Sequence, residues 1–540
     1  MKIIAIIYFE SLICVIFIHY ICSANDKSEM FDIDMIPYPF WGEDRTAKGG
    51  RDPLAIQNSS VMIYSDMVSG ITNLTSRIRY NAFYCWLLTL IAEHVDIENI
   101  DSHKHQFRYL RRGELLFAYI MHFQYPDVTG SAGSTYASNH DKGEILDLAL
   151  GADIENKTNE GGVYWKNPLG VFGQYYMGAM MQLRLVCPPD YNHSTYRPTP
   201  EGKKLQEIYS RAIDSQCEQL FWNAIHTGRI EVDVLPMLKS MALNNIKSEE
   251  ELSEYKRILS SPDNLGGKEI FNRFNTIKLL LNYIDEYEVS TKDFVLSFLR
   301  VNLLDALENG CDVSDEKIAW MLYELNELSH SAYESYHFSI LNSLSEDKPM
   351  PFDFLMKQLR ENYESYRHYA ESNTINELDI YDLYDRQKQH YRSHNYGALL
   401  YESLLMMIKI KSYCDAYRDK LTKVAQRGEY HSHPGFVIGM LERLLGNGLC
   451  LNDWQTVEKI LYAAINDHLA SSYAKSDIGQ GLVHNYMLDE GLIWPLRNPE
   501  PVRTSPRLQN VIQYLEDVGL VKKDKENYIV TESGYNFMAL

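Results

Sequence analysis

The sequence predicts a mainly α-helical protein, a large helical body with one or two winged-helix-like elements, and three observations lead to this fold class. Apolar residues recur three and four positions apart over most of residues 203–445, which is the spacing of helices with one buried face. Proline, which interrupts helices, is sparse in that stretch. Residues 505–540 follow the order helix, strand, strand, helix, with which a winged helix-turn-helix ends.

Composition is typical of a globular protein. The chain has 540 residues, of which 45% are hydrophobic and 23% are charged. This length is enough for two to four domains at roughly 100–200 residues per domain. The 52 Lys and Arg residues against 73 Asp and Glu give a net charge of −21. Because an anionic surface repels phosphates, the charge disfavours a protein that coats nucleic acid through a basic face.

The first 29 residues form a hydrophobic leader with three interpretations. An apolar run from Ile3 to Ile21 follows Lys2, and Glu10 and His19 interrupt it. It is either a misassigned start, with Met30 or Met35 as the true first residue, or a signal peptide over residues 1–24, or a membrane anchor. We expect a cytoplasmic protein, with an exported or membrane-anchored one as the alternative. The eight cysteines include no Cys-x-x-Cys pair, so neither a zinc knuckle nor a compact disulfide scaffold is indicated.

The rest of the chain is expected to divide at shifts in composition. The predicted parts are an N-terminal motif and helical region (30–126), a flexible Gly/Ser/Asn-rich excursion (127–162), a possible first winged-helix-like unit (163–215), the helical body (216–494), a proline-rich linker (495–506) and a C-terminal winged-helix-like module (507–540).

The C-terminal module has the clearest secondary-structure pattern in the sequence. Ser505 is a suitable N-cap with Pro506 at the first helical position, and Gly519 suits the end of that helix. Two short strands flank a turn at 524–527, and Thr531 caps a final helix. The same pattern occurs earlier in the chain. The corresponding pairs are Leu185 and Leu520, Val186 and Val521, Tyr196 and Tyr528, Thr199 and Thr531, and Gly202 and Gly534.

A winged helix commonly places the helix before the wing in the DNA major groove and the wing on phosphates. The candidate DNA- or partner-contacting residues are Arg507, Gln509, Asn510 and Gln513 on the helix, and Lys522, Lys523 and Lys525 on the wing. Neighbouring acidic residues offset most of this charge, so protein docking is at least as consistent with the sequence as DNA contact.

Arg79 shares the apolar face of its helix with Phe83, Trp86 and Leu90. A buried guanidinium needs a carboxylate partner, and Asp52 and Asp66 are the nearest candidates in sequence. Either a structural clamp or a binding site for an acidic ligand or partner would explain the residue.

Motifs for catalysis are weak. The sequence contains no phosphate loop, Gly-x-Ser-x-Gly elbow or His-Glu-x-x-His motif. His431 and His433 lack a partner at a recognised metal-ligand spacing, and the Glu254-x-Lys256 half of a nuclease site has no hydrophobic strand to carry it. We therefore predict no catalytic residue, metal or cofactor.

Residues 50–86 carry a family resemblance. Arg51 and Asp52 are followed by Gly70, then by an Arg-x-Arg-Tyr pattern formed by Arg77, Arg79 and Tyr80, and then by an aromatic pair ending at Trp86. This order resembles a motif of bacterial defence-island proteins, although Val68-Ser69 stands where that family has proline before glycine. The segment is similar to the accessory, non-ATPase and non-nuclease subunits of Lamassu-type and related three-component anti-phage systems.

The resemblance implies a non-catalytic scaffold that bridges an SMC-like ATPase and an effector, often a nuclease. It implies indirect DNA contact, no cofactor and no small-molecule substrate, with Arg51, Asp52, Arg77, Arg79, Tyr80 and Trp86 as structural or partner-binding residues. A winged-helix DNA-binding regulator and an exported or membrane-anchored helical protein are the alternatives.

Overall fold

The computed structural model describes residues 52–95, 102–154, 162–260, 273–310, 313–344, 348–446, 453–476, 483–497 and 499–540. Contacts divide the chain into two units, Met1–Gly50 with Lys475–Val483 and Arg51–Ala474 with His484–Leu540. The second unit is described below. The predicted leader and Arg51 lie outside the described residues. With 66% helix and 7% strand, the structure confirms the mainly helical fold class.

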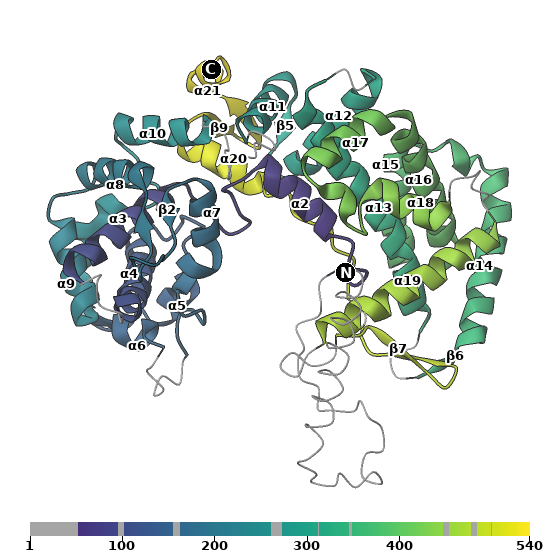
Figure 1. Cartoon of the computed structure of the whole chain (residues 1–540), viewed down its shortest axis with the longest axis horizontal. Coiled ribbons are helices and arrows are strands. Elements are labelled where there is room, and N and C mark those ends of the chain that lie inside the picture. The colour runs from purple at the N-terminus through teal and green to yellow at the C-terminus, as the bar shows by residue number, and fades with distance from the viewer. Residues whose placement is uncertain are drawn as a thin grey trace, which may run out of the picture. The chain divides into compact units, whose positions relative to one another are not determined.

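Among the helices of the N-terminal half, α5, α6, α8, α9 and η3 pack against α3 or α4, and α2 packs instead against the helical body (Figure 1). Their bounds are α2 Asn58–Met67, α3 Arg79–His94, α4 Ser102–Gln124, α5 Ser134–Asn139, α6 Leu148–Ala152, the π-helical turn η2 Phe172–Tyr176, α7 Met177–Gln182, α8 Pro200–Ala212, α9 Cys217–Thr227, the 3-10 helix η3 Val232–Met241 and α10 Glu249–Ser260. Strands here are β1 Ile145–Asp147, paired with β4 Arg229–Glu231, and β2 Val186–Cys187, paired with β3 Arg197–Pro198. All pairs are antiparallel.

The stretch 127–162 differs from the prediction of a flexible excursion. Its described part contains α5, β1 and α6, and α5 and α6 pack against α4. A Cβ atom at Gly151 would lie 2.6 Å from the side chain of Leu115, so α6 approaches α4 closely. Arg111 of α4 donates from Nε to the Ala152 carbonyl and from Nη2 to the Trp165 carbonyl. Glycine and serine content indicated a loop here, but residues 134–152 form two short helices and a strand, and both helices pack against α4.

The helical body follows. Its helices are α11 Arg273–Glu286, α12 Phe294–Glu308, α13 Asp315–Ser343, α14 Phe352–Ser372, the 3-10 turn η4 Ile375–Glu377, α15 Ile380–Arg392, α16 Tyr396–Ala416, α17 Arg418–Arg427, the 3-10 turn η5 Tyr430–Ser432, α18 Val437–Leu445 and α19 Trp454–Lys475. The long helix α13 packs against α2, α12, α15, α16, α17 and α18 and is buried along nearly its whole length (Figure 1). Strands β6 Met350–Pro351, β7 Tyr486–Asp489 and β8 Leu492–Pro495 form an antiparallel sheet in the order β6-β8-β7.

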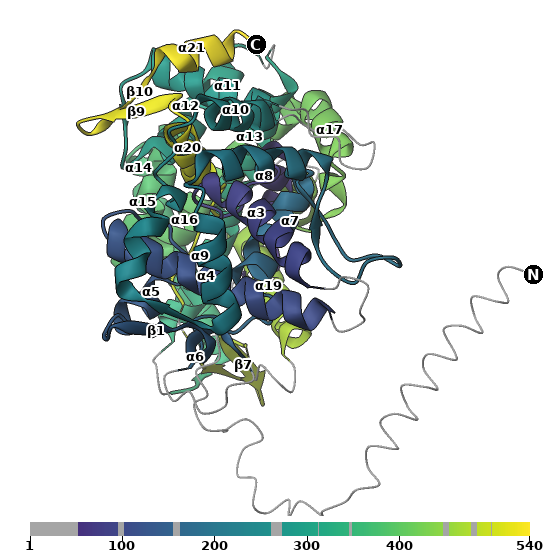
Figure 2. The same cartoon turned by 90° about the vertical axis from the view of Figure 1, so that its left-hand side faces the viewer.

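Residues 508–540 form the predicted helix, hairpin and helix: α20 Leu508–Asp517, β9 Val521–Asp524, β10 Asn527–Val530 and α21 Glu532–Met538. Gly519 adopts a left-handed φ of 72°, and the Thr531 side chain caps α21, as predicted. The start of α20 differs: Arg507, with φ of 63°, occupies the N-cap position in place of Ser505. Figure 2 shows the β9–β10 hairpin extending beyond the helices around it.

This winged helix is assembled from two distant segments. The short strand β5 Val289–Ser290 pairs with the far edge of β10, which gives a three-stranded sheet in the order β5-β10-β9. Helix α11 packs on β10 and α21, and α12 packs on β5. Residues 273–308 and residues 508–540 therefore form one module together. The helical body from α13 to α19 lies between these two segments in the sequence. Local sequence patterns cannot reveal such a pairing.

The earlier winged-helix-like unit has the same backbone hydrogen bonds as the C-terminal one. Leu185 N donates to Met180 O at 2.8 Å, as Leu520 N does to Leu515 O at 2.8 Å. The threonine caps also match, since Gly202 N donates to Thr199 Oγ1 and Gly534 N to Thr531 Oγ1, both at 3.1 Å. Both glycines lie against a carbonyl oxygen: a Cβ atom would lie 2.0 Å from Leu185 O at Gly202 and 2.4 Å from Leu520 O at Gly534.

The repeat extends to the first helix of each unit. Helix α3 begins Arg79-Tyr80-Asn81 and packs on β3 and α8; α11 begins Arg273-Phe274-Asn275 and packs on β10 and α21. Both arginines are 1% exposed. The chain thus contains two related winged-helix-like units, α3 to α8 and α11 to α21, of which the second carries the helical body as an insertion.

Among the described residues, no helix combines the length and the apolar character that crossing a membrane requires.

Candidate functional site

Arg79 is held by a buried carboxylate, which is Glu251 rather than Asp52 or Asp66. Its Nε donates to Glu251 Oε1 at 2.8 Å and its Nη2 to Glu251 Oε2 at 3.1 Å. Nη1 donates to the carbonyl of Ser240 at 2.9 Å, and the guanidinium carbon lies 5.1 Å from the centre of the Tyr209 ring. Because Arg79 and Glu251 are 1% and 0% exposed, this cluster fits the structural clamp.

Arg77 and Tyr80, which neighbour Arg79 in the motif, contact different parts of the fold. Arg77 donates from Nε to both carboxylate oxygens of Asp517 at 3.0 Å, and the backbone N–H of Ile78 donates to the same carboxylate at 3.3 Å. The motif before α3 is therefore fastened to the end of α20. Tyr80 accepts a hydrogen bond at its hydroxyl from Ala132 N at 3.0 Å. Trp86 is buried, in edge contact with Phe221 at 5.2 Å between ring centres.

Asp52, the remaining described residue of the motif, lies just before α2. It has a φ of 64°, and its Oδ1 accepts a hydrogen bond from Ile56 N at 2.9 Å. This contact fixes the turn that leads into α2.

The predicted groove-reading face of α20 is occupied by the chain itself. Arg507 Nη1 donates to the Ile71 carbonyl at 2.9 Å, and its guanidinium lies 4.9 Å from the centre of the Tyr64 ring. Asn510 Nδ2 donates to the Thr72 carbonyl at 2.5 Å. These two side chains therefore bind the segment between α2 and α3, where a DNA-reading helix would offer them to bases.

Of the other two candidate residues on α20, one is also hydrogen-bonded within the chain and one is exposed. Gln513 Nε2 donates to Asp517 Oδ1 at 3.2 Å, and only Gln509 is exposed. On the wing, Lys522, Lys523 and Lys525 are all exposed. Lys523 pairs with Glu516 of α20 at 3.0 Å.

Residues 499–507, which we call the strap, pack on α13 and do not form the hinge expected of a proline-rich linker. Arg503 pairs through Nη2 with Glu324 at 2.5 Å, and its Nε lies 3.5 Å from Glu327. The backbone N–H of Thr504 donates to Glu327 Oε2 at 3.0 Å, and the Arg503 guanidinium lies 5.3 Å from the centre of the Tyr384 ring. Both carboxylates are buried on α13, so the strap supplies the cation that offsets them.

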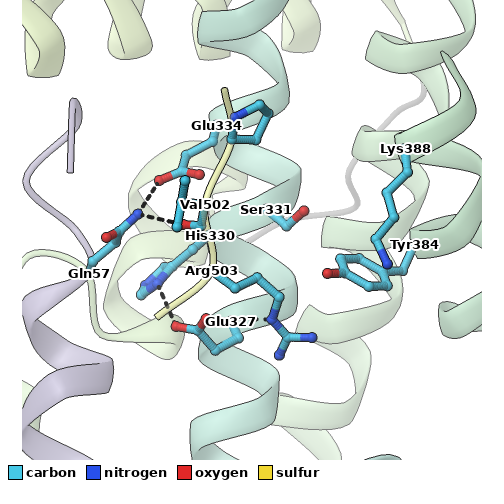
Figure 3. A pocket seen from close by; sticks show the side chains of 10 residues that line it. Gln57, Glu327, His330, Ser331, Glu334, Tyr384, Lys388, Val502 and Arg503 are labelled. Carbon is cyan, nitrogen blue, oxygen red and sulfur yellow. Dashed lines mark hydrogen bonds and ion pairs between the residues drawn. The ribbon is translucent and has the colours of Figure 1, made fainter. Parts of the chain in front are cut away.

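A cavity of about 100 Å³, which we call the α13 cavity, lies between α13, α15, the start of α2 and the strap. Figure 3 shows Glu327, His330 and Glu334 along one side of α13, with Gln57 on one side of them and Lys388 on the other. Gln57 Nε2 donates to Glu334 Oε1 at 2.9 Å and to the carbonyl of Val502 at 3.1 Å. Burial raises the pKa of Glu334 to about 8.

His330 and Glu327 are neighbours on successive turns of α13, and their closest polar atoms are too far apart for a hydrogen bond. His330 Nε2 lies 2.7 Å from the Gly435 carbonyl, which accepts only, so Nε2 carries the proton and Nδ1 is an acceptor. Nδ1 lies 3.9 Å from Glu327 Oε1, and neither atom has a hydrogen-bond partner within the part of the chain that the structure describes. Burial lowers the pKa of His330, which favours the neutral ring.

Sequence reasoning missed the α13 cavity, although a signal was present. Glu324, Glu327, His330 and Glu334 are spaced three, three and four apart, so they share one face of a helix. Their neighbours on α13 are largely apolar and buried. Ionisable residues in such a position need partners or a function.

The weak catalytic motifs have structural partners. Glu254 pairs with Lys204 at 2.7 Å and Arg257 at 2.6 Å, and Lys256 donates to Ser533 Oγ at 2.7 Å. His433 Nδ1 accepts from Gly435 N at 3.1 Å. Within the described ranges, no group of three or more His, Cys, Asp or Glu side chains is placed to hold a metal ion.

Comparison of the chain with protein-family models, with curated proteins and with solved structures finds no match.

Proposed function

We propose that the chain is a non-catalytic interaction subunit of a bacterial anti-phage or anti-plasmid defence complex, in which it bridges an SMC-like ATPase and an effector, often a nuclease. The family resemblance of residues 50–86 is the ground for the complex and its partners. In this proposal the protein acts in the cytoplasm; an exported or membrane-anchored form is the alternative.

A role in binding another protein is supported by the contacts of α20, whose predicted DNA-reading face is covered by the chain itself. Arg507 and Asn510 are bound to backbone carbonyls of the segment between α2 and α3, so they are not available to read bases. The resemblance motif itself is fastened to α20 through Arg77 and Asp517. A winged-helix module whose reading helix is committed to its own chain is better suited to bind a protein through its remaining surface than to recognise a DNA sequence.

Co-expression with the genes that flank this one tests the proposal. We expect the chain to co-elute on size-exclusion chromatography with an SMC-like ATPase and to stay associated through affinity purification. A chain that elutes alone, from a locus without an ATPase or nuclease gene, would contradict the proposal.

The alternative is a DNA-binding regulator, and the exposed wing lysines favour it. If the wing contacts phosphates, charge reversal of Lys522 and Lys525 to Glu should weaken DNA binding, and the slope of log K against log salt should fall by about 0.9 for each lost phosphate contact on duplex DNA. Fluorescence anisotropy with a labelled duplex measures both. Reversal of Lys357 and Lys459, which are exposed on α14 and α19, is the matched control. Absence of binding at about 50 mM salt would exclude this role, because non-specific contacts are strongest at low salt.

A further inference from the structure

A second cavity, which we call the α14 cavity, lies between α14 and the turn that joins α15 to α16. Helices α14 and α16 pack side by side (Figure 1), and a Cβ atom at Gly397 would lie 2.2 Å from the carbonyl oxygen of Asn362. The cavity has a volume of about 320 Å³, which falls within the roughly 300–1,000 Å³ of pockets that bind small molecules. The residues that line it are Asn362, Ser365, Tyr366 and Tyr369 of α14, and His394, Asn395, Tyr396 and Gly397 at the turn and the start of α16.

Two tyrosine rings of the α14 cavity are held in place by their hydroxyl groups. Tyr366 donates a hydrogen bond to Glu402, which is completely buried, and accepts one from Arg386 Nη2 at 2.9 Å. Tyr396 donates to the carbonyl oxygen of Asn342. Because both rings are already fixed, a ligand that packs against them does not have to order them first, which reduces the entropy cost of binding.

Other side chains of the cavity retain unused hydrogen-bonding groups. Within the described part of the chain, the side chains of Asn362, Ser365 and Tyr369 make no hydrogen bond. Asn395 accepts from Ala398 N through Oδ1 at 3.2 Å and so caps α16, while its Nδ2 makes no hydrogen bond to described residues. Amide and hydroxyl groups of this kind supply donors as well as acceptors, and none of them carries a formal charge.

Charge and ring geometry limit the chemistry of a ligand. Among the described residues, no Asp, Glu, Lys or Arg lines the cavity, so a charged ligand would find no counter-ion there. A purely apolar ligand would cover amide and hydroxyl groups without replacing their hydrogen bonds to water. The rings of Tyr366 and Tyr369 are inclined at 47° with their centres 5.5 Å apart, so they do not form a parallel slot for a flat heterocycle.

We propose that the α14 cavity binds a neutral sugar ring. In this site the sugar hydroxyl groups exchange hydrogen bonds with Asn362, Ser365 and the Asn395 amide, and a C–H face of the sugar packs against a tyrosine ring. Sugar hydroxyl groups both donate and accept, as the uncharged side chains of the cavity do, and the C–H face matches the apolar surface of an aromatic ring. The site goes beyond the proposed function, which involves protein partners, and does not depend on it.

Saturation-transfer NMR of the purified full-length chain tests the site, with the methyl glycosides of glucose, galactose, mannose and N-acetylglucosamine as probes. We expect at least one glycoside to bind saturably. Asn362→Ala and Tyr369→Ala should each raise its Kd by about threefold to tenfold, because each variant removes one contact with the sugar. Absence of a signal from all four glycosides, or a Kd that is unchanged in both variants, would overturn the proposal.

The choice of variants keeps folding separate from binding. Tyr369 is 55% exposed, and neither it nor the Asn362 side chain makes a hydrogen bond to described residues, so both variants should retain the urea midpoint of the unchanged chain. Tyr191→Ala is the matched control, because Tyr191 is fully exposed on the loop between β2 and β3. This control should leave the Kd of the glycoside unchanged, and a rise equal to that of Tyr369→Ala would contradict the assignment of the site.

A further probe separates the sugar from a flat heterocycle. The compound 9-methyladenine presents an aromatic face and polar edges but no sugar. We expect it to bind more weakly than the best glycoside and not to displace it. Displacement of the glycoside by 9-methyladenine at a lower concentration than that of the glycoside itself would overturn the sugar and assign the cavity to a nucleobase.

Discussion

Replacement of Arg79 by Met is expected to destabilise the fold by about 3–5 kcal/mol, because it leaves a buried carboxylate without its cation. Glu251 is completely buried and receives two of the five hydrogen bonds that a guanidinium can donate. Tyr255 also donates to Glu251, at 2.8 Å, but a single neutral donor cannot replace the lost charge. Urea denaturation followed by circular dichroism measures the loss as a lower midpoint at an unchanged slope.

Two controls separate the loss of charge pairing from the loss of side-chain packing. Arg211→Met breaks an ion pair of similar length, 2.7 Å to Glu250, at a site where both side chains are 56% exposed, and should cost no more than about 1 kcal/mol. Combination of Arg79→Met with Glu251→Leu should recover most of the loss, because an apolar pair no longer buries a lone charge. A double variant that is as unstable as Arg79→Met alone would show that the loss arises from packing against Tyr209 and not from the unpaired carboxylate.

The sequence identified that Arg79 must be paired, but it could not identify the partner. The helical spacing with Phe83 and Trp86 predicted burial correctly, and burial of a guanidinium demands a carboxylate. Sequence proximity then suggested Asp52 and Asp66. In the structure Asp66 accepts a hydrogen bond from Tyr430 at 2.6 Å, and Asp52 fixes the turn before α2. Glu251 is 172 residues away from Arg79, and only the packing of α10 against α8 brings it close.

The strands of the winged helix show the same limit of the sequence, which indicates local elements but not their distant partners. Glycine and threonine positions correctly predicted the hairpin β9–β10 and the cap of α21, since both depend on neighbouring residues. The third strand, β5, has only two residues, and they pair with β10 residues that lie 237 and 239 positions further along the chain. A strand of that length has no recognisable period, so its pairing could not be read from the sequence.

Arg507 and Asn510 of the C-terminal module were predicted to contact DNA or a partner, and in the structure both make hydrogen bonds within the chain. Arg507 and Asn510 are polar residues at the start of a helix, and the sequence alone gives no sign of what covers them. The segment between α2 and α3 takes both hydrogen bonds. Tertiary packing thus turned two candidate DNA contacts into internal ones.

Replacement of Arg503 by Met is expected to have an effect as large as that of Arg79→Met, about 3–5 kcal/mol, because one cation faces two buried carboxylates. Arg503 pairs with Glu324 and lies 3.5 Å from Glu327. Its loss leaves both carboxylates on neighbouring turns of α13 and frees the strap from its main side-chain contact. Arg443→Met is the matched control, since Arg443 also pairs with a carboxylate, Asp467 at 2.8 Å, and lies near a tyrosine ring, but is partly exposed.

The stability lost in Arg503→Met should depend on pH if it arises from charge, and should not if it arises from packing. Burial raises the pKa of Glu324 above its ordinary value, and Arg503 opposes that rise. A carboxyl group whose pKa is higher in the folded state than in the unfolded state costs stability when the pH rises through that range. Removal of Arg503 raises the pKa of Glu324 further and so enlarges this cost. The loss measured by urea denaturation should therefore be larger at neutral pH than at acidic pH, because the carboxyl group takes up a proton as the pH falls. An equal loss at both pH values would show that Arg503 stabilises the strap by packing on Tyr384 and not by its charge.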